Sequence, residues 1–519
     1  MYLKANSHEA TLAGKTIIGF NLIHGREVEG DLAMIQARSA VDRRDLVGIF
    51  PESGEKDVAR AAKSGAEAFH AWSRLPFEAR AKVLRHGLEQ LESHQEKLAR
   101  ILTREIGLTR AEALDEIKAI FTPFHHLTKA GKPAASAPHP PRQAGKGPQV
   151  HRRPVGVCGV LTSGASPLAA PAALIFPALL AGNTVVWKPS SLTPTSAYLL
   201  VRTLAEAGLP PGVINTLNGR GHAATGRHFL AGPEKGLFQG FLFTGSTSVA
   251  RTVAEHCGRG LIHPTLHLGA ANAMIVMPDA DLDQAVQDAL RGAYGRGGQC
   301  ASSLGNLIVH ESCLDGLRQG LLDALAELKV GNPLTHPEVA FGPMLHKRFA
   351  EAQRARWDSG EEHGANLLCG GTSWTEDNRD ERVLGNIAHG AYKQPTLWDA
   401  VTPDMELFQA ESFGPSLNLC AVRNFDEAMT WANSLRSGRA CSLYTHTQAW
   451  LDRFPAGSRA GLTALNALPS ATDTVLWNGV GTPEAEVGIT TSQWVHAKHA
   501  NAEPAQPAKP LPATAWAEL

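Results

Sequence analysis

The chain shows two hydrophobic patterns in succession. In its first part, apolar residues recur every three or four positions, which predicts helices over residues 58–72, 77–93 and 95–108. From residue 155 onward, short apolar runs typical of buried strands alternate with longer helical stretches. The pattern therefore predicts a helical beginning, after a short strand-like start, followed by repeated β-α-β units.

These β-α-β units form two sets. The first has expected strands at 155–161, 184–187, 213–217 and 241–243, and expected helices at 167–180, 193–207 and from residue 246. The second has expected strands at 273–276 and 307–309, and expected helices at 282–294 and 313–328. Helices that cross over between consecutive strands produce parallel pairing, so the fold class is α/β with parallel, doubly wound sheets.

Three segments lack a regular pattern. Residues 131–147 are rich in Pro, Gly and Ala and predict an extended arm or linker. Residues 360–390 are polar and Gly-rich, which indicates a surface excursion. Residues 501–519 are rich in Ala and Pro and predict a flexible tail.

Length and charge narrow the class of protein. The 519 residues correspond to about three domain-sized units, and 43% hydrophobic with 19% charged residues is globular. Lys plus Arg number 49 against 50 for Asp plus Glu, which argues against a nucleic-acid partner. The first nine residues lack the apolar core of a signal peptide, and no apolar run is long enough to cross a bilayer, so no membrane partner is expected.

The cysteines indicate a reducing compartment. Seven are scattered along the chain, an odd number with no CxxC pair. This distribution argues against a disulfide framework and against a zinc site, and no other metal-ligand spacing occurs. We expect reduced thiols, a cytoplasmic protein and no metal.

One cysteine lies in a setting that suggests chemistry. Cys300 follows Gly297, Gly298 and Gln299 in a Gly-rich turn, directly after the helix expected at 282–294. About fifty residues upstream, residues 243–247 (FTGST) form a strand-to-helix turn of the kind that approaches a dinucleotide. Together they suggest a cysteine nucleophile beside a nicotinamide. The alternative is that Cys300 is a small buried hydrophobic residue.

Further segments occur in a definite order with these two. They are residues 154–157 (PVGV), 167–168 (PL), 178–190 (ALLAGNTVVWKPS), 208–213 (GLPPGV), 243–246 (FTGS), 268–269 (LG) with Asn272, 278–281 (PDAD), Cys300 and 411–415 (ESFGP). Over roughly residues 55–495, the chain resembles the NAD(P)-dependent aldehyde dehydrogenase superfamily, as a divergent member.

The resemblance implies a domain organisation. Members have a Rossmann-like cofactor domain, an α/β catalytic domain that carries the cysteine, and an oligomerisation arm, and most are dimers or tetramers. The corresponding ranges are 1–130 with 154–266 for the NAD(P)-binding domain, 267–482 for the catalytic domain, 131–153 with 483–500 for the arm, and 501–519 for the tail. We expect a homodimer or homotetramer.

The resemblance also assigns residues to the adenosine end of the cofactor. Lys188 is implied to reach the adenosine ribose or its phosphate. Ser191 occupies the place where the family often has a Glu that binds the ribose hydroxyls. Without that carboxylate a 2′-phosphate is not repelled, so we expect NADP or NAD, with NADP tolerated. Arg220 or Arg227 could pair with the phosphate, and the alternative for both is a solvated surface charge.

Four more residues are implied to bind the cofactor. Gly245 and Ser246 open a helix whose free N–H groups suit a pyrophosphate or nicotinamide. Glu411 and Phe413 match the positions that hold the nicotinamide ribose and ring. The alternative for Glu411 is a helix cap or a salt bridge on a loop.

Cys300 is the expected nucleophile, and a Gly-Gly turn allows close backbone approach, with the N–H of Cys300 available as an oxyanion donor. The family form has Gln two residues before the cysteine, whereas here Gln299 is adjacent to Cys300. In the family the second oxyanion donor is an Asn side chain. The corresponding residue here is Ala165, which cannot donate, and Ser163 or Ser166 could replace it. At the position of the family's usual Glu base, this chain has His267. His267 either activates Cys300 or a water, or is a packed histidine without a role in proton transfer.

The function predicted from these residues is NAD(P)-dependent oxidation of an aldehyde to a carboxylic acid, through a thiohemiacetal and thioester on Cys300. Two alternatives stay open: a CoA-acylating aldehyde dehydrogenase and a catalytically impaired scaffold of the same fold. We expect a small-molecule aldehyde as the substrate, with a channel built from loops near residues 121–127, 168–173 and 465–477 and from the residues that flank Cys300.

Overall fold

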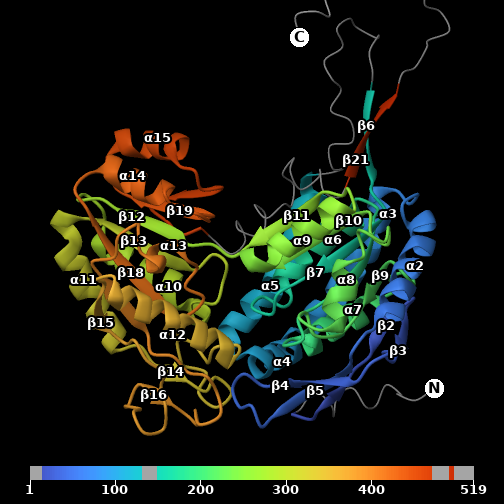
Figure 1. The fold of residues 1–519 in the computed structure, drawn as a ribbon, viewed down its shortest axis with the longest axis horizontal. Coiled ribbons are helices and arrows are strands. Elements are labelled where there is room, and N and C mark those ends of the chain that lie inside the picture. Colours follow the sequence, from blue (N-terminus) through green and yellow to red (C-terminus); the bar gives the residue numbers. More distant parts are fainter. Residues whose placement is uncertain (1–13, 131–148, 470–489, 496–519) are drawn as a thin grey trace, which may run out of the picture. The chain divides into compact units, whose positions relative to one another are not determined.

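The computed structural model describes residues 14–130, 149–469 and 490–495 (Figure 1). The chain divides into two compact units. The larger contains Met1–Pro133 and Pro154–Thr490, and the smaller contains Ala134–Arg153 and Thr491–Leu519. The tail expected at 501–519 lies outside the described residues.

The larger unit begins with a small sheet of three strands in the order β1-β5-β4. β1 is parallel to β5, and β4 is antiparallel to it. The strands are β1 (Ile17–Ile18), β4 (Met34–Arg38) and β5 (Leu46–Pro51).

A sheet of seven strands follows, in the order β11-β10-β7-β8-β9-β2-β3. Pairing is parallel from β11 to β9, and β2 and β3 are added antiparallel. The strand order reverses between β7 and β10, and such sheets bind ligands at this switch point, beyond the carboxyl ends of the strands. The strands are β2 (Asn21–Ile23), β3 (Arg26–Val28), β7 (Val157–Leu161), β8 (Thr184–Lys188), β9 (Ile214–Thr216), β10 (Gly240–Gly245) and β11 (Pro264–Leu268).

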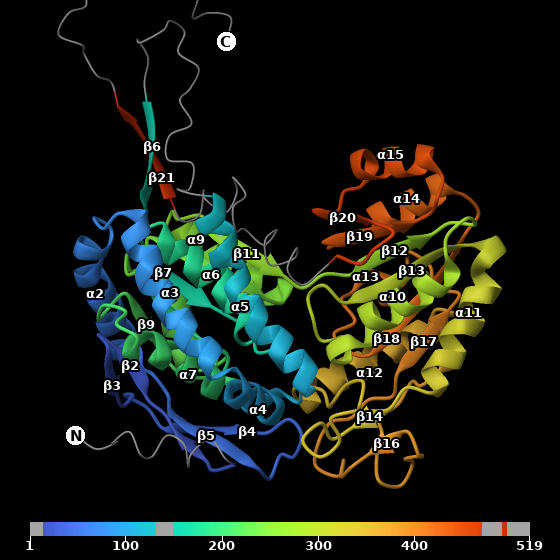
Figure 2. The same cartoon turned by 180° about the vertical axis from the view of Figure 1, so that it is seen from behind.

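Helices cover both faces of this first sheet. Along β7, Val157 and Leu161 pack with residues of α2, α8 and α9, while Cys158 and Val160 pack with residues of α3 to α7. Since both faces are covered, the strand is apolar at successive positions, as parallel strands are. Figure 2 shows α3, α6 and α5 side by side. The helices are α2 (Glu55–Trp72), α3 (Phe77–Ser93), α4 (Gln95–Ile106), α5 (Arg110–Ala130), α6 (Ala169–Leu180), α7 (Pro194–Glu206), α8 (Ala224–Leu230) and α9 (Thr247–Arg259).

A second sheet of seven strands has the order β15-β17-β18-β13-β12-β19-β20. Its pairing is parallel, except that β15 is antiparallel to β17. α10 and α11 pack on one face, and α12 to α15 on the other. The strands are β12 (Asn272–Val276), β13 (Leu304–His310), β15 (Asn366–Cys369), β17 (Thr396–Asp399), β18 (Ser416–Val422), β19 (Ala440–Tyr444) and β20 (Leu462–Leu465).

The remaining elements belong to this part or to the smaller unit. The helices are α10 (Leu282–Tyr294), the short 3₁₀ helix η2 (Gly295–Gly298), α11 (Glu311–Ala326), α12 (Lys347–Glu362), α13 (Glu406–Gln409), α14 (Phe425–Asn433) and α15 (Gln448–Gly457). β14 (Val330–Gly331) pairs with β16 (Val383–Leu384). In the region of the expected arm, β6 (Gln149–Pro154) pairs with β21 (Thr490–Val495).

Several expectations require correction. Residues 121–127 were expected in a loop, yet they lie inside α5. Residues 168–173 were expected both in a channel loop and in the helix at 167–180, and they fall almost wholly in α6, which confirms the helix. A capping box begins α5: Glu112 accepts the Thr109 N–H at 2.9 Å, and Thr109 Oγ1 accepts the Glu112 N–H at 3.3 Å. The helix continues through Pro123 because its neighbours Ile120 and Phe124 are buried in the core. The excursion expected at 360–390 also contains regular structure, β15 and β16.

Candidate active site

The predicted site residues are contributed by the two large sheets from opposite ends. Gly245 ends β10 and His267 lies in β11, at the carboxyl end of the first sheet. Cys300 precedes β13 and Glu411 precedes β18, at the amino end of the second sheet. Residues 269–271 join β11 directly to β12, which brings these two ends together.

The turn that carries Cys300 has an unusual backbone. Arg296, Gly297 and Gly298 have φ values of 55°, 61° and 66°, three successive residues in the left-handed region. A Cβ on Gly298 would lie 2.0 Å from the carbonyl oxygen of Gly414. The close backbone approach predicted for the Gly-Gly turn is therefore present, and the segment approached is the one that follows Glu411.

Two buried amides hold this turn in place. Gln299 Oε1 accepts the N–H of Leu345 at 2.7 Å. Asn272 Nδ2 donates to the carbonyl oxygens of Ala301 and Ser303, both at 2.9 Å. The turn is thus fixed on both sides of Cys300.

The anchored Gln299 also sets the register of the turn. In the family form the nucleophilic cysteine is two residues after this Gln, a position that Ala301 occupies here. The thiol of Cys300 is attached one residue earlier. Because successive residues project their side chains in different directions, the role of Cys300 needs a direct test.

Cys300 itself is partly buried, with the thiol free. Its N–H donates to Ser303 Oγ at 3.1 Å, so the prediction that this N–H is available to an oxyanion is wrong for this conformation. Burial raises the pKa of the Cys300 thiol, while the charge of Arg296 lowers it and the carboxylates of Glu116 and Glu112 raise it further.

Arg296 is a functional candidate that sequence reasoning missed. Its Nη1 donates to Glu116 Oε2 at 2.7 Å and its Nη2 donates to the carbonyl oxygen of Ala165 at 3.0 Å. Its own N–H donates to Glu112 Oε1 at 2.6 Å. Only the spacing of Glu112 and Glu116, one helical turn apart on α5, hints at this arrangement in the sequence.

Ala165, which the resemblance assigns to the position of the missing amide, offers its carbonyl to Arg296. Ser166 is not a free substitute donor, because its hydroxyl donates to Glu116 Oε1 at 2.8 Å. The same carboxylate oxygen accepts the N–H groups of Leu168 and Ala169 at the start of α6. Ser163 is partly buried and is the remaining hydroxyl in this turn.

His267 is 8% exposed. Burial, and secondly the charge of Arg439, lower the pKa of His267 to about 3. The imidazole is therefore neutral at any ordinary pH, and it holds a proton far more weakly than a histidine with its usual pKa near 6.5.

Glu411 faces the same region. A Cβ on Gly269 would lie 1.9 Å from Glu411 Oε2, so this carboxylate packs on the backbone two residues after His267. Burial raises the pKa of Glu411 to about 7, against the opposing charges of Arg356 and Arg439. Among the described residues, Glu411 is thus a carboxyl group that titrates near neutrality.

Phe413 follows on the same segment, with φ at 43°. Its ring lies 4.8 Å from the ring of Phe349, between centroids. This contact with α12 fixes the position of the ring that is predicted to face a nicotinamide.

The predicted adenosine-binding residues lie at the carboxyl end of β8 and in the loop that follows it. Lys188 is buried, and its Nζ donates to the carbonyl oxygens of Pro189 and Gly219, both at 2.8 Å. Burial lowers the pKa of Lys188 to about 8, and the Glu52 carboxylate opposes this. Ser191 is partly buried in the loop that follows.

The two arginines considered for a 2′-phosphate differ. Arg220 Nη1 pairs with Glu52 Oε2 at 3.0 Å, which offsets its charge. Arg227 is exposed at the surface of α8. Arg227 is therefore the less compensated of these two charges.

The first turn of α9 has the features of an anion site. Ser246 caps the helix, its Oγ accepting the Val249 N–H at 3.4 Å. Ser246, Thr247 and Ser248 are exposed, directly beyond the carboxyl end of β10. A pyrophosphate fits here, since the free N–H groups and the helix dipole favour negative charge.

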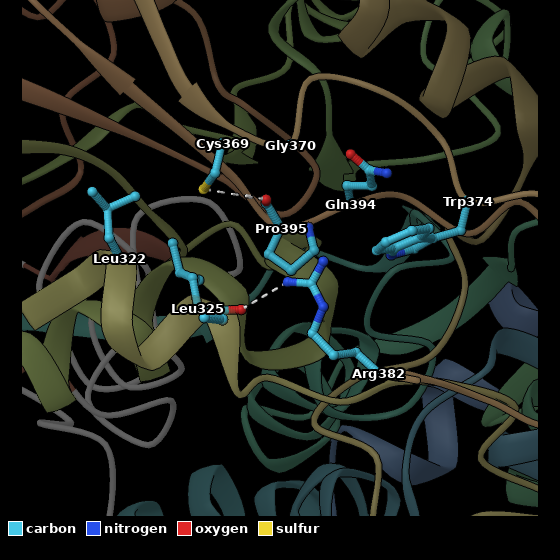
Figure 3. Close-up of a pocket in the computed structure, with 9 residues that line it drawn as sticks. Leu322, Leu325, Cys369, Gly370, Trp374, Arg382, Gln394 and Pro395 are labelled. Carbon is cyan, nitrogen blue, oxygen red and sulfur yellow. Dashed lines mark hydrogen bonds between the residues drawn. The ribbon is translucent and has the colours of Figure 1, made fainter. Parts of the chain in front are cut away.

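Within residues 14–130, 149–469 and 490–495, no group of three His, Cys, Asp or Glu side chains could hold a metal ion. A cavity of about 270 Å³ is lined by Leu325, Cys369, Trp374, Arg382 and neighbouring residues (Figure 3). It does not include Cys300. Among the described helices, none is long and apolar enough to cross a bilayer.

Comparisons with known proteins agree with the predicted family. The model of the aldehyde dehydrogenase family matches residues 29–500. The chain therefore belongs to the aldehyde dehydrogenase family.

Relatives and solved structures cover almost the whole chain. It is 30% identical to the alpha-ketoglutaric semialdehyde dehydrogenase of Bacillus subtilis, over 86% of this chain and 89% of that one. It is also 30% identical to the NADP(+) succinate-semialdehyde dehydrogenase of Escherichia coli, over 81% and 84%. The crystal structure of an NAD-dependent aldehyde dehydrogenase from Sinorhizobium meliloti superposes with a TM-score of 0.85 at 27% identity, over 96% and 98%.

The predictions of fold class and activity are confirmed by these comparisons. The chain has the α/β fold of the aldehyde dehydrogenases, and its relatives support an NAD(P)-dependent aldehyde dehydrogenase that oxidises an aldehyde. NADP or NAD is confirmed as the cofactor class. The individual roles of Cys300, His267, Lys188, Glu411 and the other site residues, like the domain boundaries, stay predictions.

Proposed function

We propose that this protein oxidises an aldehyde that carries a carboxylate, with Cys300 as the nucleophile and NAD(P) held at the switch point of the first sheet. The observation that carries the proposal is the placement of Cys300 and Glu411 at the amino end of the second sheet, joined by residues 269–271 to the end where Gly245 and Ser246 lie. Semialdehydes of dicarboxylic acids are named for several relatives, which supports the substrate class.

The nucleotide fits the residues present. Gly245 and the exposed first turn of α9 would hold the pyrophosphate, and Glu411 and Phe413 would hold the nicotinamide end. Lys188 is proposed to act through the Gly219 carbonyl that it binds, since its ammonium is buried. When bound, the nicotinamide accepts a hydride from the substrate carbon.

The thiolate of Cys300 is proposed to add to the carbonyl carbon, and water later releases the acid from the thioester. His267 is proposed to accept a hydrogen bond from that water as a neutral imidazole. Glu411, with a pKa of about 7, is the stronger base of the two.

A second candidate rests on the register of the turn, although the comparisons favour the active dehydrogenase. Counted from Gln299, the family position of the thiol is Ala301, and the two other catalytic positions hold Ala165 and His267. A chain with these three substitutions could retain the nucleotide site without the covalent chemistry. This is the impaired scaffold considered above.

An aldehyde panel with intact-mass analysis separates the candidates. Semialdehydes, aliphatic and aromatic aldehydes are each incubated with NAD or NADP, with and without CoA, and NAD(P)H formation is followed by absorbance. We expect turnover without CoA and an acyl adduct on the peptide that contains Cys300. No turnover and no adduct with any aldehyde would establish the scaffold, and a requirement for CoA would establish acyl transfer to CoA.

We also propose a homodimer or homotetramer in the cytoplasm. β6 and β21 form a sheet of only two strands, which is marginally stable unless it packs on another surface. All seven cysteines are free, which supports a reducing compartment. Light scattering on the purified full chain would test the assembly, and a monomer at micromolar concentration would contradict it.

A further inference from the structure

One face of α12 contacts the segment that carries Glu411 and Phe413. Phe349, Gln353 and Arg356 follow one another at spacings of four and three residues, so they lie on the same side of this helix. The Phe349 ring lies 4.8 Å from the Phe413 ring, between centroids. The two polar residues of this face contact the backbone and side chains of the same segment.

Arg356 holds the backbone next to Glu411. Its Nη1 donates to the carbonyl oxygen of Ser412 at 3.1 Å. A hydrogen bond from a guanidinium is stronger than one between neutral groups, because the donor is charged. Since Ser412 lies between Glu411 and Phe413 in sequence, this contact fixes the backbone that joins the two side chains proposed to hold the nicotinamide end.

Gln353 contacts the segment from the core. This residue is 1% exposed, and its Nε2 donates to Ser412 Oγ at 3.4 Å. Ser412 Oγ in turn donates to the carbonyl oxygen of Gly414 at 3.1 Å. Gln353 Oε1 has no hydrogen-bond partner among the described residues. An unpaired buried polar atom destabilises a fold, which indicates that this amide serves the segment rather than stability.

The same segment also packs against the turn that carries Cys300. A Cβ on Gly414 would lie 2.1 Å from Gln353 Nε2, closer than real Cβ atoms approach other atoms. A Cβ on Gly298 would lie 2.0 Å from the carbonyl oxygen of Gly414. The place of the segment is therefore set by close contacts with both α12 and the cysteine turn.

We propose that Gln353 and Arg356 are positioning residues for the nicotinamide end of NAD(P), because they hold residues 411–414 where Glu411 and Phe413 can meet the nicotinamide ribose and ring. The proposal rests on the roles of Glu411 and Phe413 proposed above. Both positioning residues act through the segment. The adenosine and pyrophosphate are assigned to other elements, β8 and α9, so their binding should not depend on α12.

The test compares the binding of NAD and of ADP to the full-length protein by calorimetry. ADP has the adenosine and the pyrophosphate of NAD but lacks the nicotinamide and its ribose. The variants are Arg356→Met, Arg356→Lys and Gln353→Leu. The matched control is Arg354→Met, an arginine of α12 whose side chain is 52% exposed and pairs with Asp358.

We expect the Kd of Arg356→Met for NAD to rise about tenfold, because a charged donor is lost. Arg356→Lys should regain part of this affinity, since its ammonium can still donate to the Ser412 carbonyl. Gln353→Leu keeps the size of the side chain without the amide, and its Kd for NAD should rise about threefold. The Kd for ADP should stay unchanged in every variant, and the control should bind both nucleotides like the unsubstituted protein.

Gly414→Ala gives a second test, which depends on space rather than on hydrogen bonds. The added methyl group collides with the buried Gln353 amide, so the Kd for NAD should rise at least about tenfold. Gln353→Ala makes room for this methyl group. The double variant should therefore bind NAD no more weakly than Gln353→Ala alone, whereas additive losses would contradict the contact.

A loss of affinity for NAD with the affinity for ADP retained supports the proposal. Unchanged binding of NAD, or equal losses for both nucleotides, overturns it, because equal losses show a general effect on the fold. If Arg356→Met does not fold, as judged by its thermal melt, Arg356→Lys and Gln353→Leu still give the comparison. Turnover by the unsubstituted protein with unchanged NAD binding by the variants would reject this inference alone. Selective losses of NAD affinity without any turnover would reject the proposed function alone.

Discussion

The two large sheets contribute to the site by different means. The first sheet ends in backbone features, Gly245 at the end of β10 and the exposed start of α9. The second sheet begins with turns that offer side chains, Cys300, Glu411 and, through the turn before it, Arg296. Almost any residue substitution leaves the backbone N–H in place, whereas it always replaces the side chain. The nucleotide half can therefore diverge in sequence and keep its geometry. Its departures from the family, Ala165, Ser191 and His267, all lie at side-chain positions beside the strands of the first sheet or in them.

The largest expected effect is a loss of aldehyde oxidation, with no loss of nucleotide binding, when Cys300 is replaced. Cys300→Ala should reduce aldehyde-dependent NAD(P)H formation at least about 10³-fold, because no other group can form the thioester. Binding of NADP, measured by calorimetry, should be unchanged. The control is Cys369→Ala, a partly buried thiol in the separate cavity of Figure 3. Substantial turnover by Cys300→Ala would show that Cys300 is not the nucleophile.

A second prediction concerns His267 and acid stability. In the unfolded chain this imidazole takes up a proton below pH 6.5, whereas in the folded protein its pKa is about 3. Protons therefore favour unfolding in this window, and stability is lost as the pH falls from 6.5 toward 3. Between pH 7 and pH 5, His267→Phe should gain about 2 kcal/mol relative to the unsubstituted protein.

Denaturant unfolding of both proteins at the two pH values measures this difference. Any constant effect of the larger ring cancels in the comparison. An unchanged difference in unfolding free energy would mean that His267 becomes charged in the folded protein, which would restore it as a base of ordinary strength.

A third change addresses the nucleotide half alone. Ser246→Asp keeps a good N-cap residue on α9 but puts a carboxylate where the pyrophosphate is expected. We expect the Kd for NADP to rise about tenfold or more, while alkylation of Cys300 is unaffected. Ser246→Asn is the neutral control. Unchanged affinity for NADP would place the cofactor elsewhere.

The smallest effect concerns the choice of cofactor. Ser191→Glu adds a carboxylate in the loop after β8, which repels a 2′-phosphate and can bind ribose hydroxyls. The ratio of kcat/KM for NADP to that for NAD should fall about fivefold. Ser191→Gln should change this ratio less. A ratio that does not move would indicate that the loop does not face the ribose.

Much of the fold could be predicted from the sequence, because its strands and helices are long and apolar. The predicted helices at 77–93 and 282–294 have the bounds of α3 and α10, and the buried strands β7 and β8 were placed within two residues. The strands β1 to β5 were predicted only as a short strand-like start without bounds, and helix α5 was missed. Strands β1, β2 and β3 have two or three residues, too few side chains for a period, and Pro123 with two histidines obscures the helical pattern of α5.

The candidate site was predicted where one segment carries the signal, and missed where two distant segments meet. Cys300 and Gly245 lie in motifs that can be read locally. Glu116 and Arg296 are 180 positions apart, and neither stands out as more than a surface charge. The low pKa of His267 likewise depends on burial and on Arg439, which follow only from the packed structure.

The Glu116 carboxylate ties together three stretches of chain: its own helix, the beginning of α6 and the turn before Cys300. Contacts so far apart in sequence form slowly during folding, since the intervening loops must close first. A nascent or partly refolded molecule should accordingly carry seven thiols of similar reactivity. Pulsed labelling during refolding would then show when the reactivity of the Cys300 thiol begins to differ from that of the other six thiols, which marks the formation of the active site.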